Sequence, residues 1–144
     1  MNSGLQTRSL GQKPWVAPRV LLVDHDCGDL NCDAEALRQR GYQVDVCSRW
    51  EDGVQRLERD HFDFVLVGQG SPEFEGRLVL ERAIAIDRRM PVLVVTRCPD
   101  MHCYLDAMQL GAFDYVEKPV EPSQLARIVE THIRPAKTAS SSPA

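Results

Sequence analysis

Short apolar runs alternate with segments of helical spacing along this chain, and this alternation limits the fold more than any other feature. The runs cover residues 20–23, 44–47, 64–67 and 91–95, and a shorter one lies at 115–116. Most of them would be apolar on both faces of a strand, which is typical of a parallel sheet that helices cover on both sides. The sequence therefore predicts five strands, each followed by a helix, with no internal repeat.

The segments between the runs carry apolar residues at helical spacing. Cys27, Leu30, Ala34 and Leu37 form the first set, and Gly41 after them is typical of a helix C-terminus. The later sets are Trp50, Val54 and Leu57; Leu78, Val79, Ala83 and Ile86; Leu105, Met108 and Leu110; and Leu125, Ile128, Val129 and Ile133. We predict an α/β fold, a (βα)5 doubly wound parallel sheet of five strands in the order 2-1-3-4-5.

The length of 144 residues suits one domain, and a hydrophobic content of 43% is ordinary for a globular core. We expect a flexible N-terminal tail over residues 1–17, an ordered domain over 18–134, and a disordered tail or linker over 135–144. The sequence leaves open whether an output domain follows.

Charge and composition argue against several classes of function. The formal net charge is −4 with acids and bases interspersed, so we expect no direct contact with nucleic acid. No run of about 18 apolar residues occurs, so no membrane span is expected, and the N-terminus lacks the apolar region of a secretory signal. An odd number of cysteines, five, does not suggest a disulfide framework. The simplest location is the cytoplasm.

Polar residues gather where the predicted strands end. The carboxyl ends of parallel strands lie at one edge of the sheet, and ligands bind there in such folds. We therefore expect four loops to converge, namely Asp24-His25-Asp26, Gly68-Gln69-Gly70, Thr96-Arg97 and Glu117-Lys118-Pro119.

The sequence around these loops resembles the response-regulator receiver domain of the CheY-like family. The motifs that carry the resemblance are LLVDHD at 21–26, RGYQV at 40–44, DFVLV with the later Pro72 and Gly76 at 63–76, PVLVVT at 91–96, and GAFDYVEKP at 111–119. The resemblance spans about residues 19–134 and implies a receiver-like domain with a flavodoxin-like and CheY-like three-layer sandwich.

In that family a histidine kinase passes a phosphoryl group to an aspartate at the end of the third strand, and Mg²⁺ neutralises the phosphoryl charge. The resemblance implies that Asp24 is one of the metal-binding acids, and that Thr96 and Lys118 are the residues that bind phosphoryl oxygens. Tyr115 corresponds to the aromatic residue that changes rotamer in the active state. Asp26 stands where many members carry a further acid.

Three positions depart from the family pattern. The acceptor position falls on Gly68, which has no side chain and cannot form an acyl phosphate. The second metal-binding acid is replaced by His25, a poor Mg²⁺ ligand, and Arg97 stands where the family normally has a small residue. We therefore expect a pseudo-receiver with no catalytic residue, no cofactor and no enzymatic activity. Mg²⁺ binding would be lost, or weak through Asp24 and Asp26.

The residues at these positions form what we call the degenerate pocket: Asp24, His25, Asp26, Gly68, Thr96, Arg97 and Lys118. With few anions left, Asp24 and Lys118 could pair and close this pocket. Arg97 could reach over the gap at Gly68. Without phosphorylation, Thr96 and Tyr115 could be locked in one state.

We expect the module to work through protein partners. The face formed by the helix at 105–110, the strand at 115–116 and the helix at 125–133 is the family's usual partner surface. It would present Asp106, Gln109, Asp114, Glu117 and Glu121. A homodimer is also left open.

Several alternatives remain at the sequence level. The cations Lys118 and Arg97 could hold a small anion or a nucleotide, which would make the chain a ligand-gated sensor. A Gly68-x-Gly70 phosphate loop would need a third glycine where Glu73 stands. A register error of one residue at Gly68 is the simplest structural alternative.

A zinc or redox site is a minor alternative. It would use His25, Cys27, Cys98 and His102, which all start near the same edge of the sheet. The cysteine spacings do not match the usual zinc patterns. Cys27 is expected on the apolar face of its helix, where a thiol behaves as a small hydrophobic group.

Overall fold

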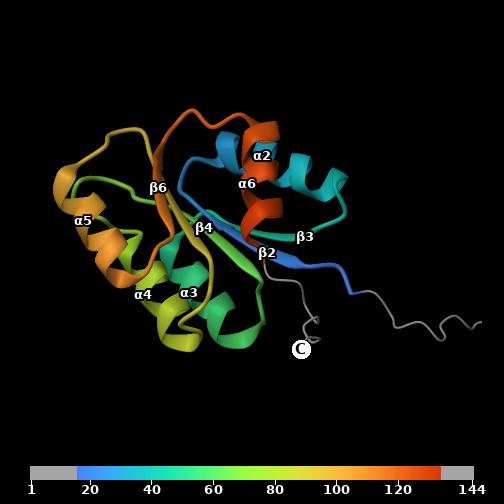
Figure 1. Cartoon of the computed structure of the whole chain (residues 1–144), viewed down its shortest axis with the longest axis horizontal. Coiled ribbons are helices and arrows are strands. Elements are labelled where there is room, and N and C mark those ends of the chain that lie inside the picture. Colours follow the sequence, from blue (N-terminus) through green and yellow to red (C-terminus); the bar gives the residue numbers. More distant parts are fainter. Residues whose placement is uncertain (1–15, 134–144) are drawn as a thin grey trace, which may run out of the picture.

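A computed structural model describes residues 16–133 of the chain (Figure 1). Strands and helices alternate along these residues as β2 (Arg19–Val23), α2 (Cys27–Gln39), β3 (Gln43–Cys47), α3 (Trp50–Arg59), β4 (Phe64–Gly68), α4 (Arg77–Ile86), β5 (Val92–Thr96), α5 (Met101–Leu110), β6 (Asp114–Glu117) and α6 (Pro122–His132). The expected tail at 135–144, and residues 1–15 of the expected N-terminal tail, lie outside the described part.

The five strands form one parallel sheet in the order β3-β2-β4-β5-β6. Numbered by their place in the chain, this is the order 2-1-3-4-5, so the predicted topology is confirmed. The register places Val23 beside Cys47 and Val67, and Gly68 beside Val95. The ends of the strands are therefore level, and the loops that follow them meet at one edge.

Alternating side chains along the strands build two hydrophobic layers, one on each face of the sheet. On one face the buried set packs against α3, α4 and α5, and it includes Leu21, Val23, Val65, Val67, Val92 and Val94. On the other face the set packs against α2 and α6, and it includes Val20, Leu22, Phe64, Leu66, Leu93 and Val95. Figure 1 shows the helices divided in the same way, with the sheet between them. This two-sided burial explains why the strands are apolar throughout.

Local capping residues fix the helices that border the degenerate pocket. Asp26 caps α2 by accepting a hydrogen bond from the backbone N–H of Asp29. Asp100 caps α5 in the same way through Cys103. Gly111 ends α5 with a left-handed φ of 116°, a conformation that favours glycine.

Four apolar residues used to predict helices lie outside the core. Leu78 at the start of α4 and Ile86 at its end are exposed, as is Leu105 on α5. The buried residues of α5 are the smaller Cys103 and Ala107, which let this helix approach the sheet. Cys27 is also exposed, so its expected position on the apolar face is wrong. It is the first residue of α2 and lies where the helix leaves the strand-end loop.

Within residues 16–133, the structure contains no helix with both the length and the apolar character that a membrane crossing needs.

Close packing of α3 on β2 makes Gly53 sensitive to added volume. A Cβ at Gly53 would lie 2.7 Å from Cγ2 of Val23, which is buried in β2. Alanine would favour the helix by about 1 kcal/mol, but overpacking costs about 1–3 kcal/mol. We predict that Gly53→Ala lowers the free energy of unfolding by about 1 kcal/mol, measured by urea denaturation.

A double-mutant cycle provides the control for this prediction. In a Val23→Ala background the clash is removed, so Gly53→Ala should be neutral or stabilising there. Equal destabilisation in both backgrounds would contradict the packing explanation.

Candidate functional site

The four strand-end loops converge as predicted and line a cavity of about 210 Å³. All seven residues of the degenerate pocket contribute to its wall, together with Gln69, Gly70, Val95 and Cys98. Asp24 follows β2, Gly68 ends β4, Thr96 ends β5, and Lys118 follows β6. The sheet register alone brings these positions together.

An ion pair between Lys118 and Asp24 joins the loop after β6 to the loop after β2 at this edge of the sheet. Lys118 Nζ lies 2.6 Å from Oδ2 of Asp24 and 3.0 Å from Oδ2 of Asp29. The side chains of Lys118 and Asp24 are only 9% and 3% exposed. Burial alone would lower the pKa of Lys118, but the hydrogen bonds to the two carboxylates outweigh it and raise the pKa. The ammonium is therefore fully charged and already has two anionic partners.

The carboxylate of Asp24 lies in the space that a side chain at position 68 would need. A Cβ built on Gly68 would lie 2.5 Å from Cγ of Asp24 and 2.6 and 2.7 Å from its two oxygens. Because Gly68 has no Cβ, the Asp24 carboxylate can turn inward to Lys118. In this arrangement Asp24 Oδ1 also accepts a hydrogen bond of 3.3 Å from the N–H of Asp26.

Arg97 forms a second ion-pair group at the rim of the pocket. Its Nη2 lies 2.9 Å from Oδ2 of Asp26 and 2.9 Å from Oδ2 of Asp29. The hydrogen bond from Arg97 is the main reason why the pKa of Asp26 is lowered to about 2. Asp29 thus bridges Arg97 and Lys118, and the guanidinium is directed to the first turn of α2.

His25 lies at the mouth of the pocket beside an aromatic ring. Its ring is 5.5 Å from that of Trp50, and Nδ1 is 3.3 Å from Oδ1 of Asp24. Trp50 in turn donates a hydrogen bond of 3.1 Å from Nε1 to the carbonyl of Gly68. Trp50 therefore fixes the end of β4 as well as anchoring α3.

The side chains present do not fit the Mg²⁺ ion that the family implies. A hard cation needs several free oxygen ligands, but Asp24 and Asp29 are paired with Lys118, and Asp26 is paired with Arg97. Gly68 offers no side-chain oxygen, and His25 offers nitrogen. Within residues 16–133 no group of three or more His, Cys, Asp or Glu side chains is arranged to hold a metal ion, so the zinc alternative gains no support either.

A buried glutamine connects the pocket to Tyr115. Gln69 is fully buried, and its Oε1 accepts a short hydrogen bond from the hydroxyl of Tyr115. Its Nε2 donates to the carbonyls of Ser71 and Cys98, at 3.2 and 3.4 Å. The Tyr115 hydroxyl accepts a further bond of 3.1 Å from the N–H of Asp100. One side chain thus links the loops after β4 and β5 to β6.

Thr96 keeps its place at the end of β5 but is already engaged. It is buried, and its Oγ1 accepts a hydrogen bond of 3.0 Å from the N–H of Cys98. The hydroxyl therefore stabilises the loop that leads into α5.

Sequence patterns do not single out two residues that matter here, Asp29 and Asp33, and they place Gln69 in a strand-end loop without giving it a role. In the sequence, Asp29 is typical of the acidic residues found in the first turn of a helix. Gln69 is a polar residue directly after a buried strand, and that position was a usable signal. Asp33 lies in the second turn of α2, half-buried in a neighbouring cavity. Burial first, and then the charge of Asp29, raise the pKa of Asp33 to about 6.

Comparison with known proteins identifies similar sequences. The family model of the response regulator receiver domain matches residues 20–130. The transcriptional regulatory protein ZraR of Escherichia coli O157:H7 is 28% identical over 124 residues, which cover 83% of this chain and 28% of the relative. The transcriptional regulatory protein DltR of Streptococcus agalactiae serotype III is 29% identical, covering 76% of this chain and 50% of the relative. The chain therefore spans half or less of the length of these relatives.

Solved structures show the same fold. The crystal structure of a CheY-like response regulator receiver domain protein from Methanospirillum hungatei JF-1 matches with a TM-score of 0.76 and 27% identity, covering 81% of this chain and 93% of that one. A receiver domain protein from Clostridium thermocellum matches with a TM-score of 0.71 and 25% identity, covering 81% and 94%.

Substitution of Gly68 tests whether Asp24 depends on its missing Cβ. We predict that Gly68→Ala lowers the free energy of unfolding by about 1–3 kcal/mol, because the methyl group displaces the Asp24 carboxylate from Lys118. Urea denaturation measures the loss. In an Asp24→Ala background the same substitution should have a much smaller effect, and an undiminished effect there would show that Asp24 is not the group displaced.

Asp33 predicts a pH dependence of stability. Because its folded pKa of about 6 lies above the ordinary aspartate value of 3.8, the folded state binds the proton more tightly, and stability falls as pH rises through this interval. We predict that Asp33→Asn stabilises the protein by about 1 kcal/mol at neutral pH, allowing for solvent screening of a half-buried group. The gain should shrink toward pH 4.

Thermal unfolding of the wild type and of Asp33→Asn across this pH range measures the effect. Glu35→Gln, an exposed acid on the same helix, is the matched control. A gain that is equally large at both ends of the range would contradict the assignment to Asp33.

Proposed function

Because the chain belongs to the response regulator receiver family, we propose that this two-component receiver domain signals without phosphorylation of an aspartate, through contacts with a protein partner. The observation that carries the proposal is Gly68 at the acceptor position, with the Asp24 carboxylate filling the adjacent space. We also propose that the module has no enzymatic activity and works in the cytoplasm.

Other side chains near Gly68 do not offer a replacement acceptor. Gln69 is an amide, and its Oε1 and Nε2 are both engaged. Asp63 lies before β4, at the opposite end of that strand, and accepts a hydrogen bond of 2.9 Å from the N–H of Arg19. Asp24 is a carboxylate, but its oxygens are engaged by Lys118 and by the N–H of Asp26. These contacts support the loss of acceptor function.

The charges of the degenerate pocket support the loss of metal dependence. In the family, Mg²⁺ offsets an excess of carboxylates and the phosphoryl charge. Here three carboxylates, Asp24, Asp26 and Asp29, face the two cations Lys118 and Arg97 at 3.0 Å or less. All three carboxylates are paired although one net negative charge remains, so a divalent cation would have to break existing ion pairs in order to bind.

The link from Gln69 to Tyr115 supports a fixed output state. In the family the aromatic residue responds to the phosphoryl group, whereas here the amide of Gln69 holds the Tyr115 hydroxyl directly. Because Gln69 is fully buried, breaking this bond would leave a buried polar group without a partner, at a cost of about 1–3 kcal/mol. The face that includes α5 and β6 would therefore keep one shape.

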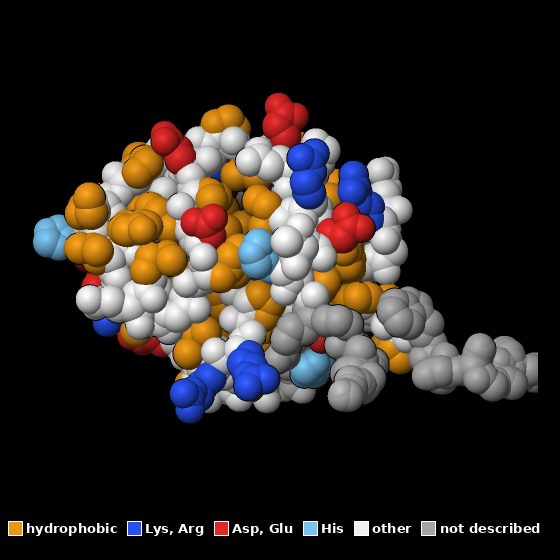
Figure 2. Space-filling model, viewed as in Figure 1, with side chains coloured by type: hydrophobic (Ala, Val, Ile, Leu, Met, Phe, Trp, Pro, Cys, Tyr) orange, Lys and Arg blue, Asp and Glu red, His pale blue; other side chains and the backbone are white. Residues whose placement is uncertain are grey.

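That face carries exposed apolar side chains next to its charged residues. Met101, Tyr104 and Leu105 on α5 are 68%, 41% and 47% exposed. Figure 2 shows hydrophobic side chains gathered over α5, at the left of the view. We propose that the partner, or a second copy of the chain, contacts α5, β6 and α6 here, which is the family's usual surface.

The alternative function, a small-anion or nucleotide-gated sensor, receives less support. Lys118 and Arg97 would have to recognise the anion, and each already has two carboxylate partners. An anion entering the cavity would therefore compete with Asp29, which contacts both.

Acetyl phosphate treatment tests the proposal. We predict that the protein incubated with acetyl phosphate and Mg²⁺ gains no acid-labile phosphoryl group by intact-mass measurement, because the acceptor carboxylate is absent and Mg²⁺ does not bind. A receiver domain with an intact acceptor aspartate, treated in parallel, shows that the reagent is active. Acid-labile phosphorylation of the wild type, at Asp24 or elsewhere, would overturn the proposal.

A further inference from the structure

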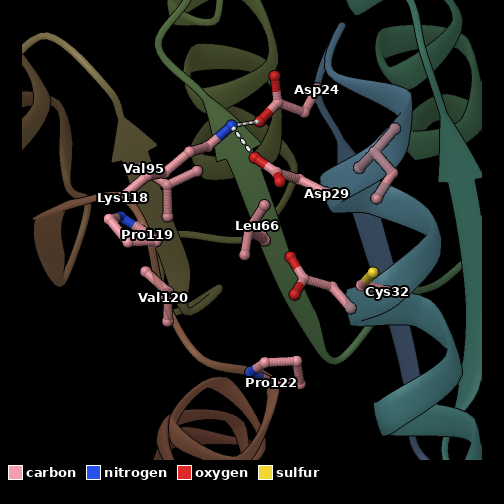
Figure 3. Close-up of a pocket in the computed structure, with 11 residues that line it drawn as sticks. Asp24, Asp29, Cys32, Leu66, Val95, Lys118, Pro119, Val120 and Pro122 are labelled. Carbon is pink, nitrogen blue, oxygen red and sulfur yellow. Dashed lines mark hydrogen bonds and ion pairs between the residues drawn. The ribbon is translucent and has the colours of Figure 1, made fainter.

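A second cavity of about 200 Å³ lies beside the degenerate pocket, between α2 and the segment that joins β6 to α6 (Figure 3). It shares Asp24, Val95 and Lys118 with the first. In Figure 3 dashed lines join Lys118 to Asp24 and to Asp29 in the wall of this second cavity. Most of its remaining wall is apolar, formed by Leu30, Leu66, Pro119, Val120 and Pro122.

Asp33 is the unpaired charge of this cavity. It is half-buried in the wall, and within residues 16–133 its carboxylate has no hydrogen bond or ion pair. Asp24 and Asp29, by contrast, both lie against Lys118. A partly buried carboxylate without a partner is unfavourable, so this position reduces stability unless something binds to it.

The charges around Asp33 indicate which sign of charge a ligand of this cavity would carry. The groups that act on it are Asp29 on its own helix, Asp24 in the loop after β2, and Lys118 after β6. Lys118 is the one cation among them, and it is shared between the other two carboxylates. The cavity therefore has an excess of negative charge at Asp33, which favours a cation and disfavours an anion.

We propose that this cavity binds a small organic cation, whose ammonium or amidinium group pairs with Asp33 and whose apolar part lies against Leu30 and Val120. A metal ion is a poorer candidate, because no group of three or more metal-ligating side chains exists among the described residues and the wall is largely apolar. An apolar cavity with one well-placed charged group is typical of small-molecule sites. The proposal goes beyond signalling without phosphorylation and does not depend on it.

Benzamidinium is a suitable probe because benzamide is its nearly isosteric neutral counterpart. We expect benzamidinium to shift the backbone amide NMR signals of residues around Asp33 and Val120 in a saturable way, with millimolar affinity for a ligand of this size. Benzamide should shift them far less. No saturable shift with benzamidinium, or equal shifts with both compounds, would overturn the proposal.

Binding measurements on variants, and at different pH, distinguish an ion pair between benzamidinium and Asp33 from general apolar binding. Asp33→Asn should weaken benzamidinium binding about tenfold, while Glu35→Gln, on the exposed side of the same helix, should leave it unchanged. Binding to the wild type should weaken below about pH 6 as Asp33 becomes protonated, and binding to Asp33→Asn should lose this dependence. Unchanged affinity in Asp33→Asn would reject Asp33 as the partner of the cation.

Discussion

The strand-end loops depend on one interaction, the ion pairing of the Lys118 ammonium with the carboxylates of Asp24 and Asp29. It connects the loop after β6 to the loop after β2 and to the first turn of α2. Removing one partner of such a buried pair typically costs about 3–5 kcal/mol, because the remaining charge stays buried. Gly68 is part of the same interaction, since a Cβ there would occupy the position of the Asp24 carboxylate. The space left by Gly68 and the ion pair of Asp24 with Lys118 are therefore two aspects of one arrangement.

Sequence patterns predict the strands and the site better than they predict the helix faces. The strands are recognisable because burial on both sides leaves no polar face, and parallel pairing brings their ends together whatever the loops contain. On α5, however, spacing alone suggested that Leu105 faces inward, whereas the helix packs through the small Cys103 and Ala107. Periodicity identifies a helix, but which of its apolar residues are buried depends on how closely that helix approaches the sheet.

Within the site, residues fixed by strand register could be predicted, and residues that act through side-chain reach could not. Asp24 and Lys118 follow directly from the ends of β2 and β6, and their pairing follows from charge. Asp29 enters the site because its side chain extends from α2 to both Lys118 and Arg97. Gln69 matters because its amide is buried and meets the hydroxyl of Tyr115. Neither contact corresponds to a residue spacing by which a sequence pattern could have predicted it.

The departures from the family pattern all make the charge of the pocket less negative. An aspartate at position 68 and a second acid at position 25 would add two negative charges, and a small residue at position 97 would remove one positive charge. With Gly68, His25 and Arg97, the neighbouring acids instead pair with cationic side chains of the chain itself. Gly68 leaves room for the Asp24 carboxylate, and Arg97 supplies the positive charge that pairs with Asp26 and Asp29. A carboxylate side chain introduced at position 68 would therefore meet the Asp24 carboxylate, which already occupies the adjacent space and pairs with Lys118.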